Sequence, residues 1–113
     1  MDRRKYARKS LRDALTCMCR IGDEEPLHGF IRNVGIMGVM VEVPDLEDGL
    51  IFECGQAIGL ERVCQENGCL IPDQSGTVTW LYREYVGVAF ASPIRDSEEE
   101  LFQWLADHGQ LCD

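Results

Sequence analysis

Short segments of alternating hydrophobic and polar residues run through most of the chain, and this alternation is typical of β-strands buried on one face. In the first of them, Leu15, Cys17 and Cys19 fall on one face, and Thr16 and Met18 fall on the other. The predicted strands cover residues 14–21, 29–34, 39–44, 56–63, 77–83 and 86–91. Because these strands are short and separated by glycine-containing turns, the pattern predicts a small closed barrel or a sandwich.

The hydrophobic period changes to that of a helix near the C-terminus. Ser97 is followed three residues later by Glu100, which is the capping-box arrangement of a helix start. Leu101 and Leu105 lie four residues apart and give the segment an apolar stripe. The pattern therefore predicts a helix over residues 96–108, which packs across the barrel or lies on a partner.

The composition fits one globular domain, since the chain has 113 residues, 45% of them hydrophobic, and shows no second compositional block. Its formal net charge of −9 disfavours binding to a nucleic-acid polymer, because most of the surface would repel phosphates. No apolar run approaches the ~20 residues of a membrane span. Arg12, Asp13 and Arg20 also interrupt the segment where a secretory signal would need an apolar core. We therefore expect a cytoplasmic protein without membrane insertion.

The positive charge of this acidic chain is concentrated at its start. Six of the eleven Lys and Arg residues fall within the first twelve positions, namely Arg3, Arg4, Lys5, Arg8, Lys9 and Arg12. Arg4 and Arg8 are four residues apart, so they can converge on one ligand. The guanidinium group of arginine binds phosphate with two parallel hydrogen bonds and can also recognise or stack on guanine. The segment is either a site for a small anionic ligand or a solubilising basic tail.

A second candidate site lies in the turn between two predicted strands, in the sequence Asn33-Val-Gly35-Ile-Met-Gly38. The amide of Asn33 can both donate and accept hydrogen bonds. Gly35 and Gly38 permit positive φ angles and close approach of a ligand to the backbone. Without other information, the same residues are equally explained as a β-turn or a bulge.

The remaining candidates do not form a catalytic set. Trp80 and Tyr82 could stack on a ring, although aromatic residues on an alternating strand are usually part of the core. His28 and His108 have no partner at a spacing typical of nucleophilic catalysis. No glycine-rich phosphate loop with a lysine is present either. We therefore expect a protein that is not an enzyme and uses no cofactor.

Six cysteines raise the possibility of a metal or thiol protein; they are Cys17, Cys19, Cys54, Cys64, Cys69 and Cys112. Structural zinc sites usually contain paired Cys-x-x-Cys motifs. Here one residue separates Cys17 from Cys19, and four separate Cys64 from Cys69. The alternative is that Cys17 and Cys19 are small core residues on a strand. We expect no metal site.

Three segments, in this order, resemble the PilZ domain, a bacterial receptor module for cyclic di-GMP. Its first motif, R-R-x-x-x-R, is similar to "RRKYAR", with Arg3, Arg4 and Arg8. Its second motif, D/N-x-S-x-x-G, is similar to "NVGIMG", with Asn33 and Gly38. The later segments "GTVTW" and "GVAF" match the family's G-x-V-x-W and G-V-x-F. The resemblance spans about residues 3 to 105.

The resemblance implies an all-β fold, a six-stranded antiparallel barrel with a C-terminal α-helix. It divides a single domain, residues 1–113, into a basic mobile arm over 1–12, a barrel over 13–92 and a helix over 96–108. It also implies that the arm closes over cyclic di-GMP against the turn, and that the ordered arm signals to an effector protein. The implied ligand-binding residues are Arg3, Arg4, Arg8, Asn33, Gly35 and Gly38.

The chain departs from the second motif at Gly35, where the family has serine. Losing one hydroxyl hydrogen bond costs roughly 0.5–1.5 kcal/mol, or about 1.5–3 kcal/mol if the partner is charged. This loss would weaken ligand binding by a factor between about two and a hundred. The alternative function is therefore a PilZ-like adaptor that no longer binds the nucleotide and acts only through protein contacts.

Overall fold

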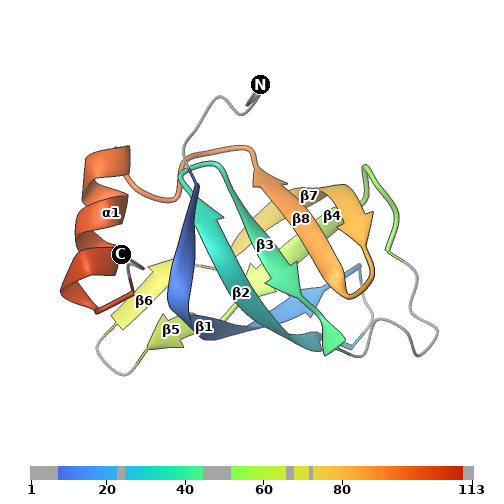
Figure 1. The fold of residues 1–113 in the computed structure, drawn as a ribbon. Coiled ribbons are helices and arrows are strands. Elements are labelled where there is room, and N and C mark those ends of the chain that lie inside the picture. Colours follow the sequence, from blue (N-terminus) through green and yellow to red (C-terminus); the bar gives the residue numbers. More distant parts are fainter. Residues whose placement is uncertain (1–7, 23–24, 45–51, 66–67, 72, 111–113) are drawn as a thin grey trace.

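A computed structural model describes residues 8–22, 25–44, 52–65, 68–71 and 73–110 of the chain (Figure 1). Six antiparallel strands close into a barrel in the order β1-β2-β3-β8-β7-β4. These strands are β1 (Arg8–Arg20), β2 (Leu27–Gly35), β3 (Gly38–Glu42), β4 (Ala57–Glu61), β7 (Gln74–Tyr82) and β8 (Tyr85–Phe90). The predicted six-stranded antiparallel barrel is confirmed.

The interior of the barrel follows from the alternation in the sequence. Val34, Val39, Val88 and Val78 are successive register partners across β2, β3, β8 and β7, and each is at most 1% exposed. The predicted inner face of the first strand is also buried, with Leu15, Cys17 and Cys19 in the core. Cross-strand neighbours of a pleated sheet point to the same side. The register partner of a residue that faces outward therefore also lies on the outer surface of the barrel.

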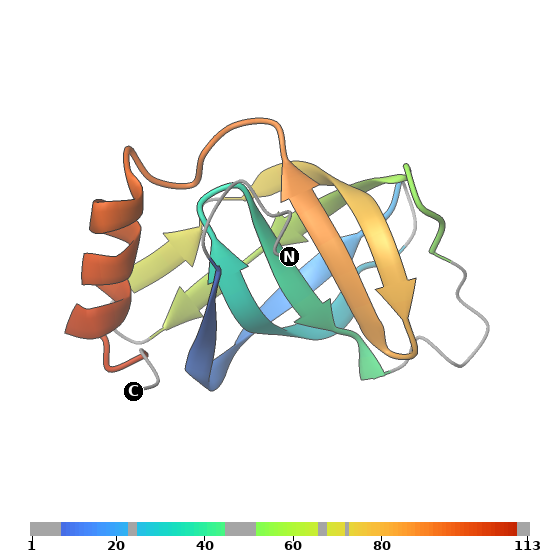
Figure 2. The same cartoon turned by 45° about the horizontal axis from the view of Figure 1, so that its top comes forward.

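Two further elements lie at one end of the barrel. A hairpin of β5 (Val63–Gln65) and β6 (Gly68–Ile71) is paired separately from the barrel sheet. The helix α1 (Glu98–Asp107) lies at the same end in both views (Figures 1 and 2). Its buried residues Leu101 and Leu105 are those of the predicted stripe. Trp104, which lies off this stripe, is half-buried, and its ring stacks on His108 with 3.7 Å between the ring centres.

The N-terminus of α1 has the predicted cap, in which Ser97 Oγ accepts a hydrogen bond from the Glu100 amide at 3.1 Å. We expect Ser97→Ala to lower the free energy of unfolding by about 1 kcal/mol, since this amide would lose its partner. Urea denaturation measures the difference. Ser92→Ala is the control, because Ser92 is exposed and precedes the helix; an equal loss in both variants would contradict the capping role.

The first strand begins earlier than the sequence pattern predicts. The predicted arm covers residues 1–12, but β1 starts at Arg8, so residues 8–12 belong to the strand. The reason is pairing with β2, which reaches Arg8, and burial of Leu11, which is 8% exposed. Residues 1–7 lie outside the described part of the chain. Among the described residues, no helix has the length and hydrophobicity needed to cross a membrane.

Candidate functional site

The start of β1 lies alongside the β2–β3 turn. Arg8 is the register partner of Gly35, and Ser10 is the partner of Asn33. Opposite residues of an antiparallel pair have Cα atoms about 4.5–5.5 Å apart. The backbone of the third motif arginine is thus adjacent to the second motif, although Arg8 and Gly35 are 27 positions apart in the sequence. Arg3 and Arg4, the other two predicted ligand-binding arginines, lie outside the described residues.

The turn itself is a tight connection of two residues, Ile36 and Met37, between the paired Gly35 and Gly38. The carbonyl oxygens of both turn residues accept hydrogen bonds from the end of β8 and the segment after it. The Phe90 amide donates to Met37 O at 2.7 Å. The Ile94 amide donates to Ile36 O at 3.0 Å in the same way. This anchoring holds the turn against the end of β8.

The two glycines of the turn do not have the positive φ angles that the sequence suggested. Positive φ occurs instead at Gly22, Gly55 and Gly109 among the described glycines. At Gly38 the reason for glycine is space, because an added Cβ would lie 2.5 Å from the backbone oxygen of Val88. Gly38 therefore allows β3 to approach β8 closely.

Asn33 has an unusual environment for a polar side chain. Its Oδ1 atom is buried and has no hydrogen-bond partner, while Nδ2 makes only a weak contact of 3.8 Å with Met40 Sδ. The register of β2 against β3 shifts between Ile31 and Asn33. An unsatisfied buried acceptor costs about 1–3 kcal/mol, so a ligand that donates a hydrogen bond to it would remove this cost.

Asn33 belongs to a row of residues that crosses the outer surface of the barrel. Asn33, Met40, Gly87 and Trp80 are successive register partners on β2, β3, β8 and β7. The Trp80 ring lies over Gly87, where any added Cβ would collide with the indole. Asn33, Met40 and Trp80 are each half-buried. We call these four residues the outer row; it combines an amide, a thioether and an indole face.

The sequence analysis favoured a core position for Trp80 over a stacking role, and the structure does not place Trp80 in the core. It is half-buried on the outer surface rather than inside the barrel. The signal that could have indicated this is Gly87, because a glycine directly opposite a tryptophan leaves space for the ring to lie flat. By contrast, Tyr82 is 62% exposed, so it is not part of the core.

The cysteines of β1 are core residues rather than reactive ones. Cys17 and Cys19 are each 1% exposed. A hydrogen bond with Cys19 and burial raise the pKa of the Cys17 thiol far above its ordinary value, so the thiol stays protonated and unreactive at neutral pH. Within the described ranges, no group of three or more His, Cys, Asp or Glu side chains could hold a metal ion.

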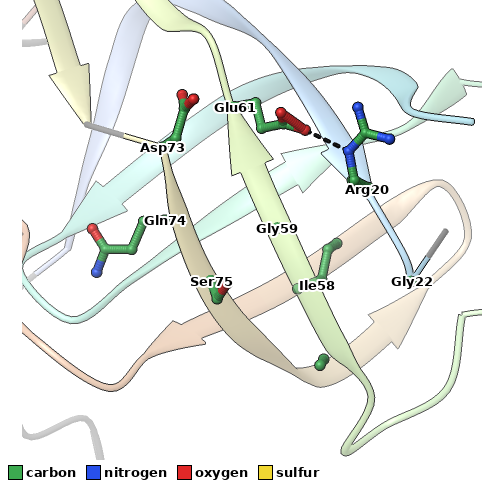
Figure 3. A pocket seen from close by; sticks show the side chains of 9 residues that line it. Arg20, Gly22, Ile58, Gly59, Glu61, Asp73, Gln74 and Ser75 are labelled. Atoms are coloured by element: carbon green, nitrogen blue, oxygen red, sulfur yellow. Dashed lines mark hydrogen bonds and ion pairs between the residues drawn. The ribbon is translucent and has the colours of Figure 1, made fainter.

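A separate surface hollow of about 400 Å³ lies on the barrel between the end of β1, β4 and the start of β7 (Figure 3). Its floor is Gly59, flanked by Arg20 and Ser75 as register partners. Arg20 is engaged with Glu61, with an Nε to Oε1 distance of 2.7 Å. Asp73 also lines the hollow and accepts a hydrogen bond from a backbone amide. The one guanidinium that lines the hollow is thus paired with a carboxylate, and Asp73 adds a second negative charge, which makes this hollow unsuitable for a phosphate ligand.

The closed six-stranded antiparallel barrel with a C-terminal helix is the PilZ-like fold that the resemblance in sequence implied. The solved structure of the Bacillus subtilis inhibitor of motility, MotI/DgrA, is similar, with a TM-score of 0.67 and 18% sequence identity. The similarity covers 96% of this chain and 52% of MotI/DgrA, so the chain spans about half the length of that protein. At this identity the likeness shows the fold alone. No protein family matches the sequence, and no curated protein matches it.

Proposed function

We propose that this chain is a receptor domain for cyclic di-GMP, in which the arginines of the N-terminal arm hold the nucleotide against the β2–β3 turn. The observation that carries the proposal is the pairing of Arg8 with Gly35 and of Ser10 with Asn33. It supports the proposal because the backbone of the last arginine of the first motif lies beside the second motif. The PilZ-like fold is a second support.

The outer row is suited to the bases of this ligand. Guanine carries amino and imino N–H donors, and the unpaired Oδ1 of Asn33 is an acceptor. Rotation of the amide about its last torsion, which is a soft one, would present Oδ1 to the base. Trp80 and Met40 offer a flat and polarisable surface beside it for stacking.

The charge distribution fits a small dianion better than a long polyanion. Six cationic residues within the first twelve positions can neutralise the two phosphates of one nucleotide. The remaining chain carries five Lys or Arg residues against nineteen acidic residues, so it would repel an extended polyphosphate. Ordering the arm costs ~1–2 kcal/mol per residue, and several charge-assisted hydrogen bonds offset this cost. The ordered arm would then present a new surface to an effector protein.

Isothermal titration of the purified chain with cyclic di-GMP in low salt tests the proposal directly. We expect saturable heat at micromolar nucleotide, with an affinity that falls as salt is added. Titration with GMP at the same concentration is the control for general phosphate binding. The absence of heat at tens of micromolar cyclic di-GMP would reject the receptor function.

Gly35 favours a second candidate, a PilZ-like adaptor that has lost the nucleotide, and the variant Gly35→Ser separates the two. If the chain is a receptor, the added hydroxyl should tighten cyclic di-GMP binding by about twofold to a hundredfold, measured by titration. Ala57→Ser adds a hydroxyl to the outer face of β4 and serves as the control. If the unaltered chain does not bind but Gly35→Ser does, the adaptor function holds instead.

A further inference from the structure

The strand that joins the basic arm to the barrel separates from β2 over a short stretch. Ser10 pairs with Asn33, and the next pair is Leu15 with Ile31, so four residues of β1 face one residue of β2. β2 can therefore pair with only some of the backbone N–H and C=O groups in this stretch of β1. The backbone N–H groups of Arg12 and Asp13 need other acceptors.

Gln110, in the segment that follows α1, supplies both acceptors. The Arg12 amide donates to the backbone oxygen of Gln110 at 2.8 Å. The Asp13 amide donates to the side-chain Oε1 of Gln110 at 3.0 Å. The position of Gln110 is itself fixed, because its own amide donates to Leu105 O at 2.7 Å, near the end of α1.

A second contact links the same two regions. The Lys9 ammonium lies 5.3 Å from the centre of the Phe102 ring on α1. Lys9 adjoins Arg8, the residue paired with Gly35. The start of β1 is thus attached on one edge to the β2–β3 turn and on the other side to the helix and the segment after it.

The glutamine at position 110 does more than fill space in the core. Gln110 is 0% exposed, and its Nε2 atom is buried without a hydrogen-bond partner. Burying an unpaired amide donor is unfavourable, and a leucine or methionine would fill the volume without this cost. The feature that only the amide provides here is the Oε1 acceptor for the amide of Asp13.

We propose that Gln110 is a positioning residue for the nucleotide site. It holds the start of β1, so that Arg8 stays in register with the β2–β3 turn. The inference rests on the proposed function and extends it, since it makes the helix and the nucleotide site energetically coupled. If docking of Gln110 favours binding, then binding favours docking of Gln110 by the same factor. An effector that contacts α1 would respond to the nucleotide through this coupling.

The test uses Gln110→Met in the full chain, because methionine preserves the volume and removes the Oε1 acceptor. Gln103→Met, an exposed change on the neighbouring helix α1, is the control. We expect Gln110→Met to weaken cyclic di-GMP binding about fivefold to tenfold in calorimetric titration, while Gln103→Met leaves it unchanged. We also expect saturating nucleotide to slow hydrogen exchange of the Arg12 and Asp13 amides in the unaltered chain. Equal affinity for Gln110→Met and the unaltered chain would overturn the proposal.

A measurement without nucleotide distinguishes failure of this inference from failure of the receptor function. Limited trypsin digestion, followed by mass spectrometry, reports cleavage after Arg8, Lys9 and Arg12. We expect Gln110→Met to accelerate cleavage at these sites at least fivefold relative to Gln103→Met. If the unaltered chain binds no nucleotide but this acceleration occurs, the receptor function fails and the positioning role at β1 remains. Unchanged cleavage in Gln110→Met contradicts the positioning role whether or not nucleotide binds.

Discussion

Replacing Arg8 with alanine is expected to weaken cyclic di-GMP binding by about tenfold to more than a hundredfold. Arg8 is the motif arginine whose backbone is paired with Gly35, so it is adjacent to the turn. Loss of one charge-assisted contact corresponds to about 1.5–3 kcal/mol, and 1.4 kcal/mol is a factor of ten in affinity. Titration calorimetry of the variant against the unaltered chain measures the change. The thermal unfolding of the ligand-free protein should change little, since Arg8 begins its strand.

Two comparison variants define what the arginine contributes. Arg8→Lys keeps the charge but loses the planar fork, so it should recover only part of the lost affinity. Arg83→Ala removes one positive charge from the β7–β8 turn, at the opposite end of β8 from the partner of Gly38, and should leave binding unchanged. If Arg83→Ala weakens binding as much as Arg8→Ala, the effect is one of net charge and the proposed arm contact is wrong.

The architecture of this protein could largely be predicted from local patterns. The alternation around Leu15, Cys17 and Cys19 predicted a strand with a buried face, and the structure buries that face. The capping residue Ser97 and the Leu101/Leu105 stripe predicted the helix, which spans Glu98–Asp107. These features depend on neighbours within a few residues, so the sequence displays them directly.

Features that depend on contacts between distant segments could not be predicted in this way. The early start of β1 at Arg8 arises from pairing with β2. In the irregular stretch of β1, the backbone amides of Arg12 and Asp13 donate hydrogen bonds to Gln110, which lies 97 residues beyond Asp13. The β5–β6 hairpin was missed because its strands are short, with three and four residues. None of these arrangements leaves a periodic signal in the chain.

The motifs named the candidate residues of the site, but their spatial arrangement could not be predicted from the sequence. The motifs named Arg8, Asn33, Gly35 and Gly38, and the strand register places Arg8 opposite Gly35. Of the two reasons given for the glycines, positive φ applies to neither Gly35 nor Gly38, and close approach of a ligand stays a prediction. Trp80 was not included in the site because its strand position alone cannot show whether its face is inside or outside the barrel.

Gly38 should be the most sensitive position for stability in the turn region. We expect Gly38→Ala to reduce the free energy of unfolding by about 1–3 kcal/mol, because its Cβ would lie 2.5 Å from the Val88 backbone oxygen and β3 or β8 must shift. Equilibrium unfolding in urea measures this difference. The shift should also move the anchored Ile36–Met37 turn and so weaken nucleotide binding in the same variant.

Gly59→Ala is a matched control, since it also places a methyl group on a barrel strand. Its added Cβ would lie 3.7 Å from the nearest atom, the Arg20 backbone oxygen, which is an ordinary contact. Alanine there should be neutral or should stabilise the strand by roughly 0.5–1 kcal/mol, because it reduces the entropy of the unfolded chain. Equal effects of the two substitutions would show that β8 can yield at Val88 without cost. In that case Gly38 is not required for the close approach of β3 to β8, and its match to the motif must be explained by direct contact with the ligand.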